Sequence, residues 1–234
     1  MHYIPFISTL VTFAFTISVF HRFLVRRGPH LLLWALGLLF YGIGTLSEVL
    51  LGFAFNGVVL KLWYLCGAML TAAWLGQGTV HLLVKKRGIA LILTGILTIL
   101  SLLATFFVLN AQLMPAAATY NITQPISAQY HDILTRSGLI ILLTILLNIY
   151  GTLTLIGGAV YSAFIFWRKR ILLNRMIGNI LIAVGAMAPA MAGSFVKMGL
   201  PDLLYLSELV GVVLMYIGFV RSTTNPVTKT VLPT

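Results

Sequence analysis

Two glutamates, Glu48 and Glu208, are the residues whose type and position most strongly suggest chemistry. They are two of only four acidic residues in the sequence, and each lies inside a long apolar run. In a helix, Glu48 would lie eight residues before Asn56 and Glu208 six residues after Asp202, which is roughly 9–12 Å from the end of each run. An ionisable group at that depth is costly and marks a functional residue that faces a bundle interior or a water pocket.

Further polar side chains accompany the two carboxyl groups. Tyr41 shares a helical face with Glu48, and Tyr205 shares one with Glu208. Lys61 would neutralise Glu48 if their helices pack side by side, although it could equally form a pair that only orients the fold, or extend outward to the membrane surface. In this interpretation Glu208 donates a hydrogen bond as a neutral acid and Glu48 organises the site. The candidate ligand-binding residues are Glu48, Glu208, Lys61, Tyr41, Tyr205 and Lys197.

The composition identifies the class of protein and excludes several functions. Hydrophobic residues make up 60% of the 234 residues and charged residues only 8%, which is typical of an all-α integral membrane protein. A single cysteine permits no intrachain disulfide and no cysteine metal site, and four acids are too few for most carboxylate-rich active sites or metal sites. No catalytic constellation is present, so we predict no enzyme activity, no metal and no dedicated cofactor, with a lipid or another apolar molecule as the expected ligand.

Seven apolar stretches are each long enough to cross a bilayer core about 30 Å thick, which needs ~20 helical residues. They predict one seven-helix transmembrane domain over residues 1–221, and residues 222–234 are expected to form a short disordered cytoplasmic tail with no output domain after it. The first stretch has no positively charged segment before it and is expected to be a retained anchor. The spans are approximately 3–24, 31–55, 58–84, 89–109, 138–167, 172–196 and 202–221.

The basic residues predict the orientation. Placing the N-terminus outside puts twelve of the fifteen lysines and arginines on the cytoplasmic side, as expected in a cell membrane. The basic residues form short clusters between apolar runs, so orientation in an anionic bilayer explains them and nucleic-acid binding is not expected. Trp34 and Trp167 would lie near the inner membrane boundary and Trp63 near the outer one, as aromatic anchors do.

Small and polar residues indicate which helix faces point inward. Ala68, Ala72 and Gly76 recur at four-residue spacing, which predicts a close helix–helix seam. Pro189 interrupts span 172–196 and is a candidate hinge, with static packing around a bend as the alternative. Two polar stripes are expected to link helices by hydrogen bonds. They are Trp74, Gln77 and His81, and Thr144, Asn148 and Thr152.

One connection is long, from Asn110 to Ser137, and would lie outside. A long loop in a compact membrane protein is often a lid or a binding loop, and a mobile hydrophilic connector is the equally weighted alternative.

Several aromatic, glycine and proline positions suggest a family, and they are Trp34, Tyr41, the run from Trp63 to Gly76, Asn174-Arg175, Gly185, Pro189 and Gly218-Phe219. In these positions the chain resembles the bacterial seven-helix sensor modules that precede histidine kinases and cyclases. The resemblance implies a receptor-like module of the bacterial plasma membrane, here without an attached output domain. Span 202–221 contains no lysine, so we expect no retinal-binding rhodopsin.

The sequence therefore favours a non-enzymatic sensor that binds a small apolar or amphipathic ligand in the outer half of the bundle. A shift of span 172–196 about Pro189 would signal to a separate membrane or cytoplasmic protein. The alternative is an accessory or structural subunit of a membrane complex that binds lipid or pigment. A transporter is disfavoured because no internal repeat is apparent.

Overall fold

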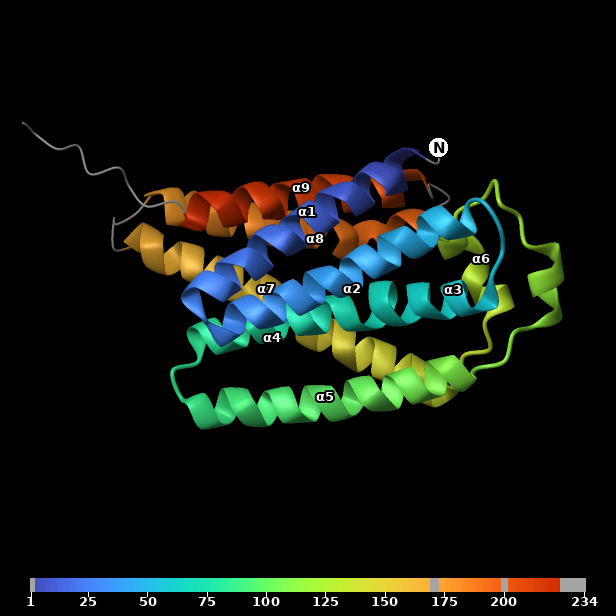
Figure 1. Cartoon of the computed structure of the whole chain (residues 1–234), viewed down its shortest axis with the longest axis horizontal. Coiled ribbons are helices and arrows are strands. Elements are labelled where there is room, and N and C mark those ends of the chain that lie inside the picture. The colour runs from blue at the N-terminus through green and yellow to red at the C-terminus, as the bar shows by residue number, and fades with distance from the viewer. Residues whose placement is uncertain (1–2, 169–172, 199–201, 224–234) are drawn as a thin grey trace, which may run out of the picture.

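The computed structural model describes residues 3–168, 173–198 and 202–223. Within these ranges the chain is almost entirely helical, and the long helices run along one common axis (Figure 1). One isolated antiparallel bridge joins Leu113 to Leu134 in the long connection. The all-α architecture predicted from the sequence is confirmed.

Each predicted span corresponds to a long helix, although the second helix ends at Leu51 and not at residue 55 as predicted. Six of these helices are long and apolar enough to cross a membrane, and α8 is apolar over its described stretch from Leu173 to Pro189, so the chain is a multi-pass membrane protein. The long helices are α1 (Tyr3–Arg26), α2 (Pro29–Leu51), the continuous series α3 (Gly57–Leu62), η1 (Trp63–Leu70) and α4 (Thr71–Leu83), then α5 (Arg87–Asn110), α7 (Gly138–Arg168), α8 (Leu173–Lys197) and α9 (Asp202–Thr223). The connection after α5 holds the short helices η2 (Pro115–Thr119) and α6 (Ile126–Ile133).

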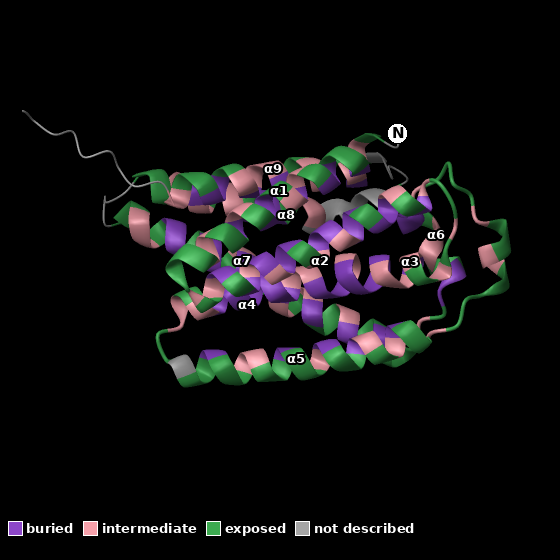
Figure 2. Cartoon of the chain, viewed as in Figure 1, coloured by how far each residue is buried: buried purple, intermediate pink, exposed green. Residues whose placement is uncertain are grey.

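Six helices form a closed ring. Following the contacts around the bundle, α1 packs on α2, α2 on α4, α4 on α7, α7 on α8, α8 on α9, and α9 returns to α1. Helix α5 lies outside this ring against α4 and α7, along one edge of the bundle in Figure 1. Figure 2 shows α5 exposed along most of its length, with the buried residues gathered around α2 and α4. The large apolar side chains on the exposed face of α5 are suited to lipid contact.

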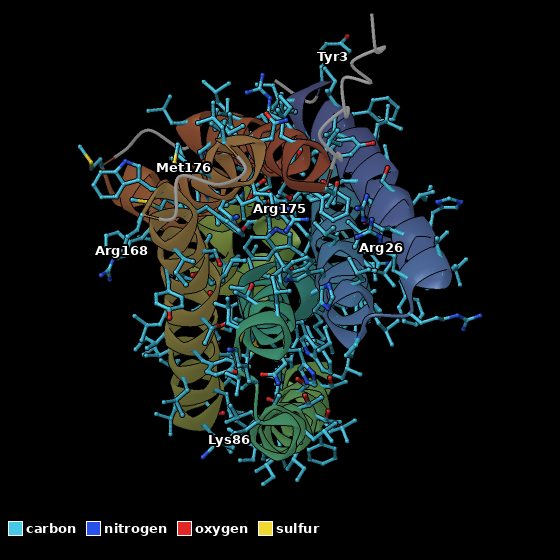
Figure 3. The ribbon with its side chains drawn as sticks, turned by 90° about the vertical axis from the view of Figure 1, so that its left-hand side faces the viewer. Tyr3, Arg26, Lys86, Arg168, Arg175 and Met176 are labelled. Carbon is cyan, nitrogen blue, oxygen red and sulfur yellow. The ribbon has the colours of Figure 1, made fainter. Side chains whose placement is uncertain are left out.

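Two ends of the bundle differ in character. The end that carries α6 and the start of α1 is called the α6 end, and the opposite end, which carries Arg26, Lys86, Arg168 and Arg175, is called the basic end (Figures 1 and 3).

The predicted small-residue seam is the contact between α4 and α7. A Cβ atom added to Gly76 would lie 3.0 Å from the carbonyl oxygen of Gly151, and one added to Gly151 would lie 2.5 Å from the carbonyl oxygen of Ala72. Asn148 continues the seam by donating a hydrogen bond to the carbonyl oxygen of Ala68 at 2.7 Å. Backbones at this separation leave no room for side chains, so van der Waals contact between main chains holds the pair together.

A second seam joins α8 to α9 through glycines seven residues apart on each helix. A Cβ added to Gly185 would lie 2.6 Å from the carbonyl oxygen of Gly211, and one added to Gly178 would lie 2.6 Å from that of Gly218. The contacts are reciprocal, as expected for two antiparallel helices in register. Helices α8 and α9 are therefore one tightly packed unit.

Both polar stripes link helices, as predicted. His81 Nε2 and the Thr94 hydroxyl of α5 are hydrogen-bonded at 2.7 Å, and Gln77 donates to the same hydroxyl at 2.8 Å while accepting from Tyr150 of α7. The Thr144 hydroxyl bonds the Tyr64 hydroxyl at 3.0 Å. These bonds connect α5 and α7 to the continuous series α3–η1–α4, which is called the third span.

Candidate functional site

The two glutamates predicted to belong to the site, Glu48 and Glu208, line a cavity of about 650 Å³ in the half of the bundle next to α6. Its wall comes from α2, the third span, α7, α8 and α9, and α6 covers its end. Volumes of roughly 300–1,000 Å³ are typical of small-molecule sites. Among its lining residues are Tyr41, Thr45, Glu48, Trp63, Ser127, Tyr130, His131, Asn148, Thr152, Pro189, Leu204 and Glu208.

Glu48 and Glu208 form a pair inside this cavity. Oε1 of Glu48 accepts a hydrogen bond from the indole N–H of Trp63 at 2.9 Å. The Oε2 atoms of both glutamates are buried and accept no hydrogen bond from any other residue that the structure describes, although the two carboxyl groups lie within hydrogen-bonding reach of each other. Two ionised carboxylates side by side in an apolar cavity repel strongly, so the pair favours holding one proton between them. It then carries a single negative charge.

The helix that presents Trp63 is a π-helix at this point. Helix η1 runs from Trp63 to Leu70, and its wider turn shifts the hydrogen-bonding pattern of the backbone. Thr71 satisfies the carbonyl oxygen of Cys66 through its hydroxyl at 2.8 Å, and Asn148 satisfies that of Ala68. Segments of this kind occur frequently at functional sites, and this one forms a wall of the cavity through Trp63, Gly67 and Ala68.

The long connection is a packed cover at the α6 end. Tyr130 of α6 lies against the rings of Trp63 and Tyr64, with centroids 5.3 and 5.7 Å apart, and Ile133 is buried. Tyr120 donates a hydrogen bond to the carbonyl oxygen of Leu51 at 3.2 Å. Burial raises the pKa of the Tyr120 and Tyr130 phenols, so both remain neutral hydroxyls at physiological pH. The connection is therefore packed over the end of the cavity, and its role as a lid or binding loop stays a prediction.

The structure brings together three of the six predicted ligand-binding residues. Tyr41, Glu48 and Glu208 line the cavity, and the Tyr41 hydroxyl also donates to the backbone carbonyl of Glu208 at 3.1 Å. Tyr205 shares a neighbouring hollow of about 50 Å³ with Glu48, under the loop. The side chain of Lys197 lies outside the described residues. Pro189, the candidate hinge, lies in the cavity wall.

The predicted pair between Glu48 and Lys61 is wrong. The Lys61 ammonium instead donates to the carbonyl oxygen of Leu109 at 2.8 Å. Leu109 is in the last turn of α5, where carbonyl groups lack helical partners and the helix dipole favours a cation. Lys61 therefore donates to a carbonyl group at the end of α5. Trp63 occupies the position beside Glu48 that was predicted for Lys61.

Several lining residues were not predicted to belong to the site. Trp63 was expected to be an interfacial anchor, yet only 8% of it is exposed. One property of the sequence could have predicted the contact. A buried indole N–H needs a hydrogen-bond acceptor, and Glu48 is one of the few acceptor side chains in the apolar spans. Tyr130 was assigned only to the loop, and Asn148 only to a helix–helix contact; no pattern in the sequence places either beside the carboxyl groups.

A second cavity of about 630 Å³ opens toward the basic end. It lies inside the ring, and all six ring helices contribute to its lining. Leu75, Leu155 and Met215 line both cavities, so this apolar layer separates them. The sequence-based prediction placed the ligand site in the α6 half and did not include this second cavity.

No family model, curated protein or solved structure matches this chain. The resemblance to seven-helix sensor modules stays a prediction.

Proposed function

We propose that this protein is a non-enzymatic, receptor-like membrane module whose α6-end cavity binds a small amphipathic ligand. The observation that carries the proposal is the buried pair of Glu48 and Glu208, whose Oε2 atoms lack donors from the rest of the described chain. A buried acceptor without a donor is costly, and a ligand that supplies one recovers that cost. The matching group is an ammonium or another hydrogen-bond donor attached to an apolar body, because most of the cavity wall is apolar.

We propose further that all seven long helices cross the cell membrane, with the N-terminus and the α6 end outside. Twelve of the fifteen basic residues then lie inside, which supports this orientation. Cysteines introduced at the exposed Thr123 and Lys86 test it in intact cells with a membrane-impermeant maleimide. We expect labelling of Thr123→Cys alone, and of Lys86→Cys only after permeabilisation. The native Cys66 is buried, so the unmodified protein is the blank; the reverse pattern would overturn the orientation.

The layer between the cavities offers a route for a signal. Leu75, Leu155 and Met215 touch both cavities, so a ligand that displaces them on one side changes the packing on the other. Met215 belongs to α9, which is joined to α8 by the glycine seam, and Pro189 of α8 lines the ligand cavity. The moving element would then be the α8–α9 unit rather than α8 alone, and a separate partner would read its position at the basic end.

The ligand proposal is tested with octylamine, which is protonated at neutral pH, against octanol as a neutral probe of equal chain length. In a neutral detergent, octylamine is expected to raise the thermal unfolding temperature more than octanol does, because the ammonium offers a positive charge and three donors to the carboxyl pair, whereas the hydroxyl of octanol offers one neutral donor. Differential scanning fluorimetry with the native tryptophans measures both shifts.

The test variant carries both Glu48→Gln and Glu208→Gln. The control variant carries Asp132→Asn alone. Asp132 is an exposed carboxylate of α6 that does not line the cavity. The double variant should lose about tenfold or more in apparent octylamine affinity, while the control should respond like the parent. Equal responses from all three proteins would show that the amine does not bind at the carboxyl pair.

A transporter is the second candidate because the two cavities lie on one axis behind a single apolar layer. Reconstitution in liposomes distinguishes it from a receptor. A receptor binds octylamine without speeding its passage across the bilayer, whereas a transporter accelerates the flux and loses it in the Glu48→Gln variant.

A further inference from the structure

The basic-end cavity is apolar in its depth. Phe15 and Val19 of α1, Leu38 of α2 and Phe219 of α9 are buried side chains of its wall, and the layer with Leu155 forms its floor. Nothing in this deep part offers a charge. A ligand that fills it must therefore carry an apolar chain.

The mouth of the same cavity is basic. Arg22, Arg26 and Arg175 line it, together with His30 and Asn179. Arg22 is already engaged, since its guanidinium donates to the carbonyl oxygen of Thr223 at 2.9 Å and lies 5.9 Å from the centre of the Phe219 ring. Arg26 and Arg175 are exposed. In Figure 3, which looks onto this end, Arg175 lies over the middle of the bundle and Arg26 lies over the α1–α2 side, whereas Arg168 and Lys86 lie at the edge.

Among the side chains that the structure describes, no acidic one lines this cavity beside the arginines. Of the four acids, Glu48 and Glu208 line the other cavity, Asp132 is in α6, and Asp202 begins α9 at the α6 end. Three guanidinium groups around one opening create a positive potential that attracts an anion from outside the chain. Arginine is also the side chain best suited to bind phosphate and carboxylate through paired hydrogen bonds.

We propose that the basic-end cavity binds an anionic amphiphile, with its chain in the apolar depth and its phosphate or carboxylate head on Arg26 and Arg175. The combination of a deep apolar chamber and a basic rim without an acidic partner among the described side chains favours this class over a free anion, which would leave the chamber unfilled. A membrane lipid is the natural source, because the cytoplasmic leaflet supplies anionic lipids at the depth where this rim lies in the proposed orientation. The site is distinct from the carboxyl pair and does not depend on what that pair binds.

The test uses dodecyl phosphate as the probe, with inorganic phosphate and dodecanol as probes of the head and of the chain alone. In a neutral maltoside detergent, dodecyl phosphate is expected to raise the unfolding temperature at concentrations where neither partial probe does so. Arg26→Gln with Arg175→Gln should weaken this response about tenfold or more, because both head contacts are lost. Lys86→Gln with Arg168→Gln is the matched control, since it removes the same charge from the edge of the same end. That control should respond like the parent.

A second variant tests the binding of the dodecyl chain independently of charge. Ala159 lines the apolar depth of the cavity. The phenyl ring of Ala159→Phe should occupy part of this space and weaken the binding of dodecyl phosphate while leaving the arginines in place. Three outcomes would overturn the proposal. Inorganic phosphate as effective as dodecyl phosphate would identify a free-anion site, and dodecanol as effective would identify a purely apolar one. A response unchanged in the Arg26–Arg175 variant would show that the head binds elsewhere. In liposomes, native mass spectrometry should find phosphatidylglycerol retained over phosphatidylcholine in the parent and not in that variant.

Discussion

Replacing Gly151 with leucine is expected to lower the free energy of unfolding by about 3 kcal/mol, the upper part of the range for overpacking. Gly151 of α7 lies directly against the backbone of α4, and a Cβ atom there would lie 2.5 Å from both the carbonyl oxygen of Ala72 and the amide nitrogen of Ala73. These are main-chain atoms, which cannot move aside as the tip of a side chain can. The two helices must separate, and the seam that closes the ring opens with them.

Gly157→Leu is the matched control on the same helix. Apart from the adjoining turns of its own helix, no described atom lies within 4 Å of a Cβ added to Gly157, and this glycine is exposed. The control is expected to hold or slightly raise stability, because leucine is the better helix former by somewhat under 1 kcal/mol in water-soluble hosts. Thermal unfolding followed by size-exclusion chromatography compares the two variants. Similar unfolding temperatures would mean that α4 and α7 are not in backbone contact at Gly151.

The α4–α7 seam could be predicted from the sequence only in part. The spacing of Ala68, Ala72 and Gly76 identified which face of the third span packs closely, because four-residue spacing is a property of one helix. It could not identify Gly151 as the partner. The choice of neighbouring helix depends on how all the helices close into a ring, and the spacing of residues along a single helix contains no such information.

The site was predictable in the same partial way. Glu48 and Glu208 were identified because burying an acid is costly, which holds in any arrangement of the helices. Their neighbours depend on small rotations. Lys61 and Trp63 are two residues apart and point to different faces, so only one can reach Glu48. Charge complementarity favoured Lys61, but the free carbonyl groups at the end of α5 compete for the ammonium and leave the carboxylate to the indole.

The second cavity was not predicted, for a different reason. The preference of basic residues for the cytoplasmic side is enough to explain the positions of Arg22, Arg26 and Arg175 in the sequence. The sequence therefore offered no reason to assign these arginines to a binding site. The sequence-based interpretation was consistent but incomplete. The arginines surround a chamber only because the six ring helices leave their axis unfilled on the basic side of the Leu75, Leu155 and Met215 layer.

Replacing each glutamate with leucine is expected to change stability in different ways. Glu48→Leu leaves the Trp63 indole N–H buried without its acceptor, which should destabilise the fold by about 1–3 kcal/mol. Glu208→Leu removes a carboxyl group that has no donor other than the shared proton, and Tyr41 still donates to the backbone carbonyl at that position. Exchanging such a group for an apolar one of similar size is typically neutral or stabilising. The parent and Glu208→Leu should therefore unfold at similar temperatures, well above Glu48→Leu.

The octylamine response separates these structural effects from binding. Both leucine variants should lose most of it, because each leaves a single carboxyl group in the cavity and removes half of the acceptors available to an ammonium. A stable Glu208→Leu protein that no longer responds would tie Glu208 to the ligand without any contribution from misfolding. If Glu208→Leu instead unfolds as early as Glu48→Leu, the proton shared between the carboxyl groups is a structural bond of the bundle. The pair would then hold α2 to α9, as Tyr41 already does, and the case for a ligand in this cavity would lose its main support.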